Sequence, residues 1–252
     1  MAPSVLLPAG PPPGFPQCRR CPYVQVGPAS ICVRCARRAF ELIGADACPI
    51  CSQQLNSDGR CPNQLCRDPG RRISRIHAVA YWSGPLRRII YDYKYEGASG
   101  WSGVFGRLVL GWLELQAREQ PPDLIVANPT FTGPGGRPFA HTEAVLWKAA
   151  AEDRSARWAF DLDWPLAIVK VGATAPSASE TADGKLAAAR ELRDALRIPD
   201  VSRIEGRRIL VYDDVCTTGS QLDVIAERLL DEGRAAEVQG LVLARAPWRQ
   251  RL

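Results

Sequence analysis

The sequence is short of the features that mark membrane proteins and common nucleotide-binding sites. It has no run of about 18 apolar residues, so no transmembrane helix is expected. No glycine-rich stretch ends in Gly-Lys-Ser/Thr, which excludes a Walker-type phosphate loop. Histidine is scarce, with two in the chain, and a lone His141 is more typical of a surface or capping residue than of a catalytic base.

The beginning of the chain also lacks a secretion signal. Residues 1–16 are rich in Pro and Gly and contain no charged region followed by an apolar stretch, so we expect a disordered tail. This pattern favours a cytoplasmic protein without membrane insertion. The net charge of +5 is mild, and it permits a polyanionic partner without requiring one. A length of 252 residues suits one α/β domain with a small appendage.

Cysteine, by contrast, is abundant and concentrated: eight of the nine cysteines lie between positions 18 and 66, in four close pairs. Disulfides are disfavoured without a secretion signal, and two thiolates on one tight turn can face a single metal ion. Four ligands leave no open position, which indicates one or two structural zinc ions, paired sequentially or in an interleaved order. The predicted ligands are Cys18, Cys21, Cys32, Cys35, Cys48, Cys51, Cys61 and Cys66.

Arginines outnumber acids in this cysteine-rich region. The excess gives weak support to nucleic-acid binding, and an ordinary solvated small domain is equally compatible with it.

From about residue 76 onward, strand patterns alternate with helical patterns, which predicts a mostly parallel α/β sheet. The expected strands are 77–82, 123–128, 166–171, 209–212 and 238–244. The expected helices are 86–95, a segment within 100–119, 139–151, 185–196 and 222–230.

The most informative stretch begins with the apolar run 209–212, which is typical of a buried parallel strand. Asp213 and Asp214 lie where that strand is expected to end, and residues 217–220 form a small, hydroxylated loop before the next helix. Backbone N–H groups of such a loop and helix start point toward a bound anion. The stretch therefore predicts a phosphate site at the carboxyl edge of the sheet.

This stretch resembles the motif with which type I phosphoribosyltransferases bind phosphoribosyl pyrophosphate (PRPP). The whole chain resembles the ComF (competence protein F) family, which combines a zinc ribbon, a Lys-x-x-Gly element (here residues 94–97) and a phosphoribosyltransferase-like domain. The resemblance covers about residues 18–246. It implies a double zinc ribbon at 17–70 and a parallel-sheet α/β domain of the type I phosphoribosyltransferase kind at 76–252.

The resemblance also implies roles for individual residues. Asp213 and Asp214 would be the catalytic acids, binding the ribose hydroxyls or a Mg²⁺ ion through water. Catalysis would then consist mostly of positioning and charge stabilisation. Cys216 lacks a nearby base in sequence, so we interpret it as a small apolar filler rather than a nucleophile. The implied PRPP-binding residues are Asp213, Asp214, Val215, Cys216, Thr217, Thr218, Gly219 and Ser220.

The chain departs from the family pattern on the pyrophosphate side. The usual Pro-Val-Pro is replaced by Asn128, Pro129 and Thr130, and the usual Arg-Gly-x-Asn-Gln keeps its arginine as Arg137 but loses both amides. The possible pyrophosphate or substrate contacts are Lys94, Asn128, Pro129 and Arg137; Lys94 is equally compatible with a surface lysine.

Two function classes therefore remain open. The first is a phosphoribosyltransferase that uses PRPP and Mg²⁺ with an unknown acceptor. The second is a non-catalytic module that responds to PRPP or a nucleotide, with a zinc ribbon that binds single-stranded DNA or a protein of the DNA-uptake (competence) machinery.

Overall fold

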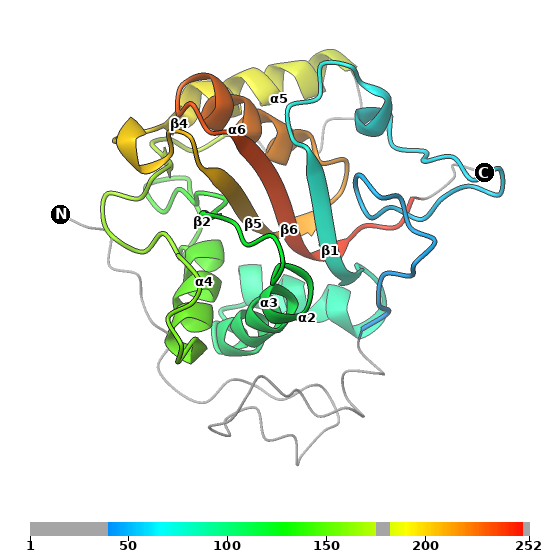
Figure 1. Ribbon diagram of the computed structural model, residues 1–252, viewed down its shortest axis with the longest axis horizontal. Coiled ribbons are helices and arrows are strands. Elements are labelled where there is room, and N and C mark those ends of the chain that lie inside the picture. The colour runs from blue at the N-terminus through cyan, green and yellow to red at the C-terminus, as the bar shows by residue number, and fades with distance from the viewer. Residues whose placement is uncertain (1–39, 175–181, 249–252) are drawn as a thin grey trace.

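The computed structural model describes residues 40–174 and 182–248 (Figure 1). The expected tail at 1–16 and the first four predicted zinc ligands, Cys18, Cys21, Cys32 and Cys35, lie outside the described residues.

A four-stranded parallel sheet forms the centre of the molecule, which confirms the predicted fold class. Its strands are β1 (Arg75–Tyr81), β2 (Leu124–Ala127), β5 (Arg208–Cys216) and β6 (Glu237–Arg245). They lie in the order β1-β6-β5-β2, and every neighbouring pair is parallel. All four carboxyl ends therefore meet at one edge of the sheet.

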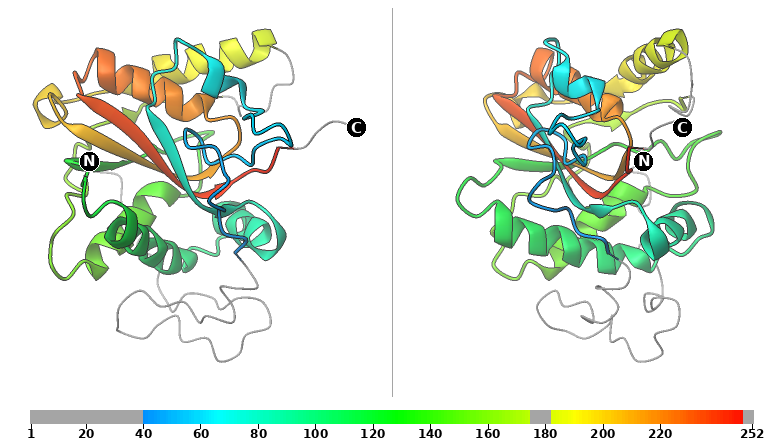
Figure 2. Two further views of the ribbon diagram at one scale, coloured as in Figure 1. Left: turned by 45° about the vertical axis from the view of Figure 1, so that its right-hand side comes forward. Right: turned by 90° about the vertical axis from the view of Figure 1, so that its right-hand side faces the viewer.

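Helices cover both faces of this sheet (Figure 2). One face packs against α2 (Gly84–Tyr95), α3 (Trp101–Gln116) and α4 (His141–Glu152), and the other against α5 (Ala182–Ala195) and α6 (Ser220–Asp231). Because side chains alternate along a strand, Leu210 and Tyr212 join the first core, and Ile209 and Val211 join the second. The unbroken apolar run of β5 is explained by burial on both faces.

The expected strand 166–171 is wrong in extent and place. Only β3 (Val169–Lys170) is extended, and it pairs antiparallel with β4 (Leu196–Arg197) outside the main sheet. The preceding backbone is bound by a side chain instead of a neighbouring strand, since the Ala167 N–H donates to Asp161 Oδ2 at 2.7 Å. Two short 3₁₀ helices, η1 (Gln64–Arg67) and η2 (Val201–Arg203), were not anticipated.

The end of β5 also differs from expectation. The strand continues to Cys216, so Asp213 and Asp214 lie inside it rather than after it. Backbone pairing with β6 extends past both acids, which holds their Cα positions as firmly as those of the core.

The described part of the cysteine-rich region, residues 40–70, lies along the edge strand β1. The Ile76 N–H donates to the Ile50 carbonyl at 2.7 Å, and Leu42 forms an antiparallel bridge with Ala80. The segment thereby covers a strand edge that would otherwise be open. Across the described residues, no helix combines the length and the apolar character needed to cross a membrane.

Candidate functional site

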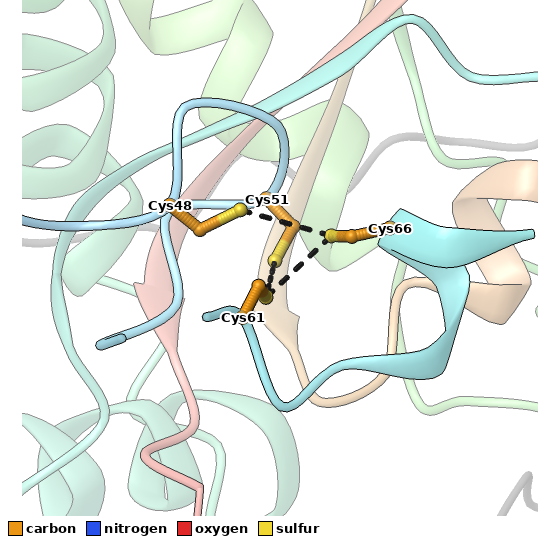
Figure 3. Close-up of side chains that lie close together, drawn as sticks. All are labelled: Cys48, Cys51, Cys61 and Cys66. Carbon is orange, nitrogen blue, oxygen red and sulfur yellow. Dashed lines mark hydrogen bonds between the residues drawn. The ribbon is translucent and has the colours of Figure 1, made fainter. Parts of the chain in front are cut away.

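Four cysteines come together beside β1 (Figure 3). The sulfur atoms of Cys48, Cys51, Cys61 and Cys66 all lie within 4.8 Å of one another. The Cys48–Cys66 pair is 3.8 Å apart, and Cys51–Cys61 and Cys61–Cys66 are each 3.7 Å apart. A tetrahedral zinc ion with Zn–S bonds of about 2.3 Å requires sulfur separations of about 3.8 Å, whereas a disulfide requires about 2.0 Å. These four thiols fit one closed tetrahedral metal site, consistent with zinc and with sequential pairing of this half of the array.

The surroundings shift the pKa values of Cys51 and Cys61 in opposite directions. Burial raises the pKa of Cys61 to about 11. At Cys51 burial also raises the pKa, but the charge of Arg245 and a hydrogen bond from Asn63 outweigh it and lower the pKa to about 7. Cys51 is therefore the thiol most ready to become the thiolate that a metal ion requires.

A second buried cluster is centred on Asp214. Lys94 Nζ lies 2.9 Å from each of its carboxylate oxygens, and His141 Nε2 lies 3.2 Å from Oδ2. Burial alone would raise the pKa of Asp214, but Lys94 and His141 hold it well below its usual range. For Lys94, burial lowers the pKa and the two aspartates more than compensate, so its pKa is raised. The end of α2, the start of α4 and β5 thus build one ion-paired centre.

Asp213 differs from its neighbour although the two are adjacent. Successive side chains of a strand point to opposite faces, and no cation lies within ion-pair distance of Asp213 among the described residues. One carboxylate oxygen accepts the Asp214 N–H at 2.9 Å. Burial and the charge of Asp214 raise the pKa of Asp213 to about 6. Asp213 is therefore the carboxylate with capacity left for a hydroxyl or a hydrated cation.

His141 is not a surface residue, contrary to expectation, since it is 8% exposed. Its carbonyl accepts the Tyr93 hydroxyl at 2.6 Å, and Thr130 Oγ1 lies 3.4 Å from Nδ1. The available signal was its place in the Arg137–His141 element, where the family has an amide side chain. An imidazole N–H can act as a donor toward Asp214, as the N–H of an amide side chain can.

The loop between β5 and α6 leaves its small polar side chains accessible. Thr217 and Ser220 are exposed, and Thr218 Oγ1 lies 2.9 Å from Ser220 Oγ. Gly219 has a φ of 89°, and a Cβ there would lie 2.8 Å from both Ile76 Cδ1 and Leu65 Cδ2. Glycine is required at this position by backbone conformation and by space.

Cys216, the last residue of β5 before this loop, is buried. Burial raises the pKa of its thiol to about 12, so the thiol stays protonated near neutral pH. Such a buried, neutral thiol behaves as a small apolar side chain.

The remaining predicted contacts lie around these groups without forming one cluster. Asn128 is buried, and its Oδ1 accepts a 3.4 Å hydrogen bond from Gln221 of α6, a residue that the sequence did not single out. Pro129, next to it, is also buried. The Arg137 guanidinium lies over the Tyr95 ring at 4.8 Å, beside Lys94 rather than against Asp214.

The fold and these two clusters define an α/β protein with a parallel sheet, a four-cysteine metal-type site and an acid-and-hydroxyl site at the carboxyl edge. The chain is 30% identical over 224 residues to DNA utilization protein YhgH of Escherichia coli O6:H1, which covers 87% of this chain and 90% of that protein. It is 28% identical over 222 residues to the protein of the same name in Salmonella typhimurium, with the same coverage. The chain belongs to this family of DNA utilization proteins. No family model matches it.

Proposed function

We propose that this protein binds single-stranded nucleic acid on the outer face of α2. In the same proposal, residues 213–220 bind a sugar-phosphate group together with Mg²⁺. The name of its relatives, DNA utilization protein, favours this DNA-related hypothesis over transferase activity. The observation that carries it is a group of exposed tyrosines and arginines beside the Asp214 cluster.

This tyrosine–arginine face consists of Arg88, Tyr91, Tyr95 and Arg137. Tyr91 is 46% exposed and Tyr95 is 51% exposed, with ring centroids 5.0 Å apart. The Arg88 guanidinium lies 5.5 Å from the first ring and that of Arg137 lies 4.8 Å from the second. Exposed rings flanked by guanidinium groups suit single-stranded nucleic acid, because any base can stack on the rings while cations attract the phosphates.

The described cysteine-rich segment is less suited to this task. Arg72 is paired with Asp231, Arg71 donates to the Ile73 carbonyl at 2.9 Å, and Arg60 lies 3.9 Å from Asp58. These guanidinium groups already have partners within the protein, as does Arg88 of the α2 face, which pairs with Asp92 at 2.7 Å; the α2 face differs in its two exposed tyrosine rings. Within the part of the chain that is described, the α2 face is the better candidate for the DNA contact.

The tyrosine–arginine face lies next to the Asp214 cluster. Tyr95 follows Lys94, whose ammonium group reaches Asp214. A strand that stacks on the two tyrosines would direct a terminal sugar-phosphate toward the loop at the start of α6, where backbone N–H groups favour an anion. Asp213, the carboxylate without a cation, would meet the ribose hydroxyls or the hydrated Mg²⁺, since oxygen ligands suit this ion.

The test is fluorescence anisotropy with a labelled oligothymidylate at several salt concentrations. We expect the affinity to fall as salt rises. Replacing both tyrosines, Tyr91→Ala with Tyr95→Ala, should weaken binding by about tenfold or more, because each stacked base contributes about 1–3 kcal/mol. The matched control is Tyr91→Phe with Tyr95→Phe, which keeps the rings. Equal affinities for the alanine and phenylalanine variants would refute this placement of DNA.

A second candidate is phosphoribosyl transfer from PRPP, favoured by the order of two acids, a hydroxylated loop and a helix start. Calorimetric titration with PRPP and Mg²⁺ tests the binding step, and release of pyrophosphate tests turnover. Both should disappear in the Asp213→Asn/Asp214→Asn variant. Binding without pyrophosphate release across nucleobases and ammonia would leave a non-catalytic module.

A further inference from the structure

Arg245, the last residue of β6, lies between the cysteine cluster and the loop that follows β5. It is fully buried, with 0% of its surface exposed. Its Nη1 donates to the carbonyls of Cys216, at 2.9 Å, and Thr217. Its Nη2 lies 3.7 Å from Cys51 Sγ. One guanidinium group therefore joins a predicted metal ligand to the backbone of the phosphate loop.

The charge of this guanidinium requires a counter-charge, because an unpaired buried cation is costly. Among the described residues, no carboxylate lies within ion-pair distance of Arg245. Four thiolates around one divalent ion leave a net charge of about −2, close to the ligand that Arg245 contacts. The metal-bound cluster is thus a suitable counter-ion for Arg245.

The cysteine-rich segment contacts the same loop, and the residue after Arg245, at further points. Asn63, which is 2% exposed and lies between Cys61 and Cys66, donates to the Thr218 carbonyl at 2.9 Å. Gln53 donates to the Ala246 carbonyl at 3.1 Å, next to Arg245. Leu65 fills the space where a side chain at Gly219 would lie.

These contacts determine the direction of the loop's N–H groups. In a trans peptide, the carbonyl of one residue and the N–H of the next point in opposite directions. The Cys216 carbonyl accepts from both Arg245 and the Ala246 N–H, the Thr217 carbonyl accepts from Arg245, and the Thr218 carbonyl accepts from Asn63. The next three N–H groups, those of residues 217–219, therefore point away from these donors. None of these three N–H groups has an acceptor among the described residues. Three successive free donors form a cradle for an anion.

We propose that Arg245 and Asn63 are positioning residues that couple the metal centre to the anion-binding loop. A bound metal ion keeps Arg245 and Asn63 in place. These two hold the Thr217 and Thr218 carbonyls inward, and together with the Ala246 N–H they hold that of Cys216, so that three N–H groups face the ligand. Metal loss then releases the loop, although the metal never touches the ligand. The anion-binding half of this coupling rests on the proposed function, whereas the link from metal to loop does not.

The first experiment is hydrogen exchange in the full chain, with zinc bound and after removal by a chelator, measured at the N–H groups of Ser220, Asp223 and Ala246, whose acceptors belong to this loop or to the residue before it. We expect exchange at these positions to become at least about tenfold faster without metal. Loop exchange that stays the same after metal loss would overturn the coupling.

Variants of Arg245 separate its contact with Cys51 from its hydrogen bonds to the loop. Arg245→Gln should weaken zinc retention by about 10–100-fold in competition with a chromophoric chelator, as outer-sphere partners commonly do. Arg245→Lys keeps the positive charge but loses the two-nitrogen geometry of the guanidinium group. It should therefore retain most of the zinc affinity while hydrogen exchange in the loop becomes faster. The matched control is Arg71→Gln. Arg71 donates to the Cys66 carbonyl at 3.4 Å, and among the described residues it makes no hydrogen bond to the loop at 217–219. Equal behaviour of the Arg245 and Arg71 variants would refute the role of Arg245.

Asn63→Ala provides an independent route should Arg245→Gln not fold, and it should accelerate loop exchange. Titration with PRPP or inorganic phosphate then separates this inference from the proposed function. If zinc removal releases the loop and neither probe binds the zinc-loaded protein, the coupling is supported and the proposed phosphate site is refuted. Equal binding of a probe with and without zinc would overturn the coupling itself.

Discussion

The cysteine cluster and the Asp214 cluster are both buried and charged, but they are assembled over different distances along the chain. All four cysteines come from residues 48–66, and Cys66 lies within η1. Asp214 instead meets Lys94 across 120 residues, and His141 arrives from a third element. A local cluster can be inferred from spacing alone, whereas a long-range cluster exists only after the sheet has formed.

The two clusters also differ in what neutralises them. The thiols of the first would need an external cation, while Asp214 carries its own in Lys94, 2.9 Å away. We therefore expect the cysteine cluster to depend on metal supply and the Asp214 cluster to depend on the integrity of the fold. The following predictions examine this contrast, from the largest expected effect to the smallest.

Loss of one metal ligand should have the largest effect. Cys51→Ala should abolish zinc binding by this cluster and lower the free energy of unfolding by at least about 4 kcal/mol, because metal-binding energy is also folding energy. The matched control is Cys216→Ala, a buried cysteine outside the cluster, which should cost about 1 kcal/mol and leave zinc content unchanged. Urea denaturation and metal analysis measure both. Similar losses for the two variants would contradict a metal role for Cys51.

Removing the internal cation should come next. Lys94→Met leaves Asp214 buried with His141 alone, which should cost about 3 kcal/mol, because breaking one side of a buried ion pair strands the other. The double variant Lys94→Met/Asp214→Asn should cost less than the sum of its single changes, because it removes both charges and leaves no unpaired charge buried. Urea unfolding of the four proteins supplies this cycle. Strict additivity would show that the two groups do not interact.

Much of this arrangement was predictable, and the rest depended on long-range packing. Spacing predicted Cys48, Cys51, Cys61 and Cys66, and the apolar run before the two acids predicted β5. The sequence could not reveal the partners of Asp214, because the Lys-x-x-Gly element marks Lys94 and the element after Arg137 marks His141, but neither pattern identifies the group that each side chain meets. Arg245 ends a strand like many surface arginines, and only its burial between two other segments distinguishes it.

The two aspartates should respond to pH in opposite directions. Asp213 has a pKa of about 6, above its usual 3.8, so its protonated form stabilises the folded state. That contribution is present below about pH 4 and is lost as pH rises through about 6. Asp213→Asn should therefore stabilise the protein at pH 8, by about 1–3 kcal/mol relative to its effect at pH 4. Denaturation at both pH values measures this.

Asp214 has a lowered pKa, so its stabilising contribution is present above its usual pKa and is lost as pH falls. Asp214→Asn should therefore destabilise the protein at pH 8, in contrast to Asp213→Asn. Substitutions that shift stability in the same direction at pH 8 would contradict the different environments assigned to the two acids.

The smallest expected effect concerns His141 and separates its contact with Asp214 from its packing. His141→Gln replaces the imidazole by an amide that can still donate to Asp214, so the free energy of unfolding should change by less than about 1 kcal/mol. His141→Leu fills similar space but removes the donor, and it should cost about 1–3 kcal/mol because the carboxylate stays buried. Urea denaturation at pH 8 compares the two. Equal losses would instead assign the role of His141 to its ring contacts with Tyr93 and Phe139, whose centroids lie 6.5 and 6.2 Å away. In that case Lys94 alone would neutralise Asp214, and the long-range cluster would reduce to a single ion pair.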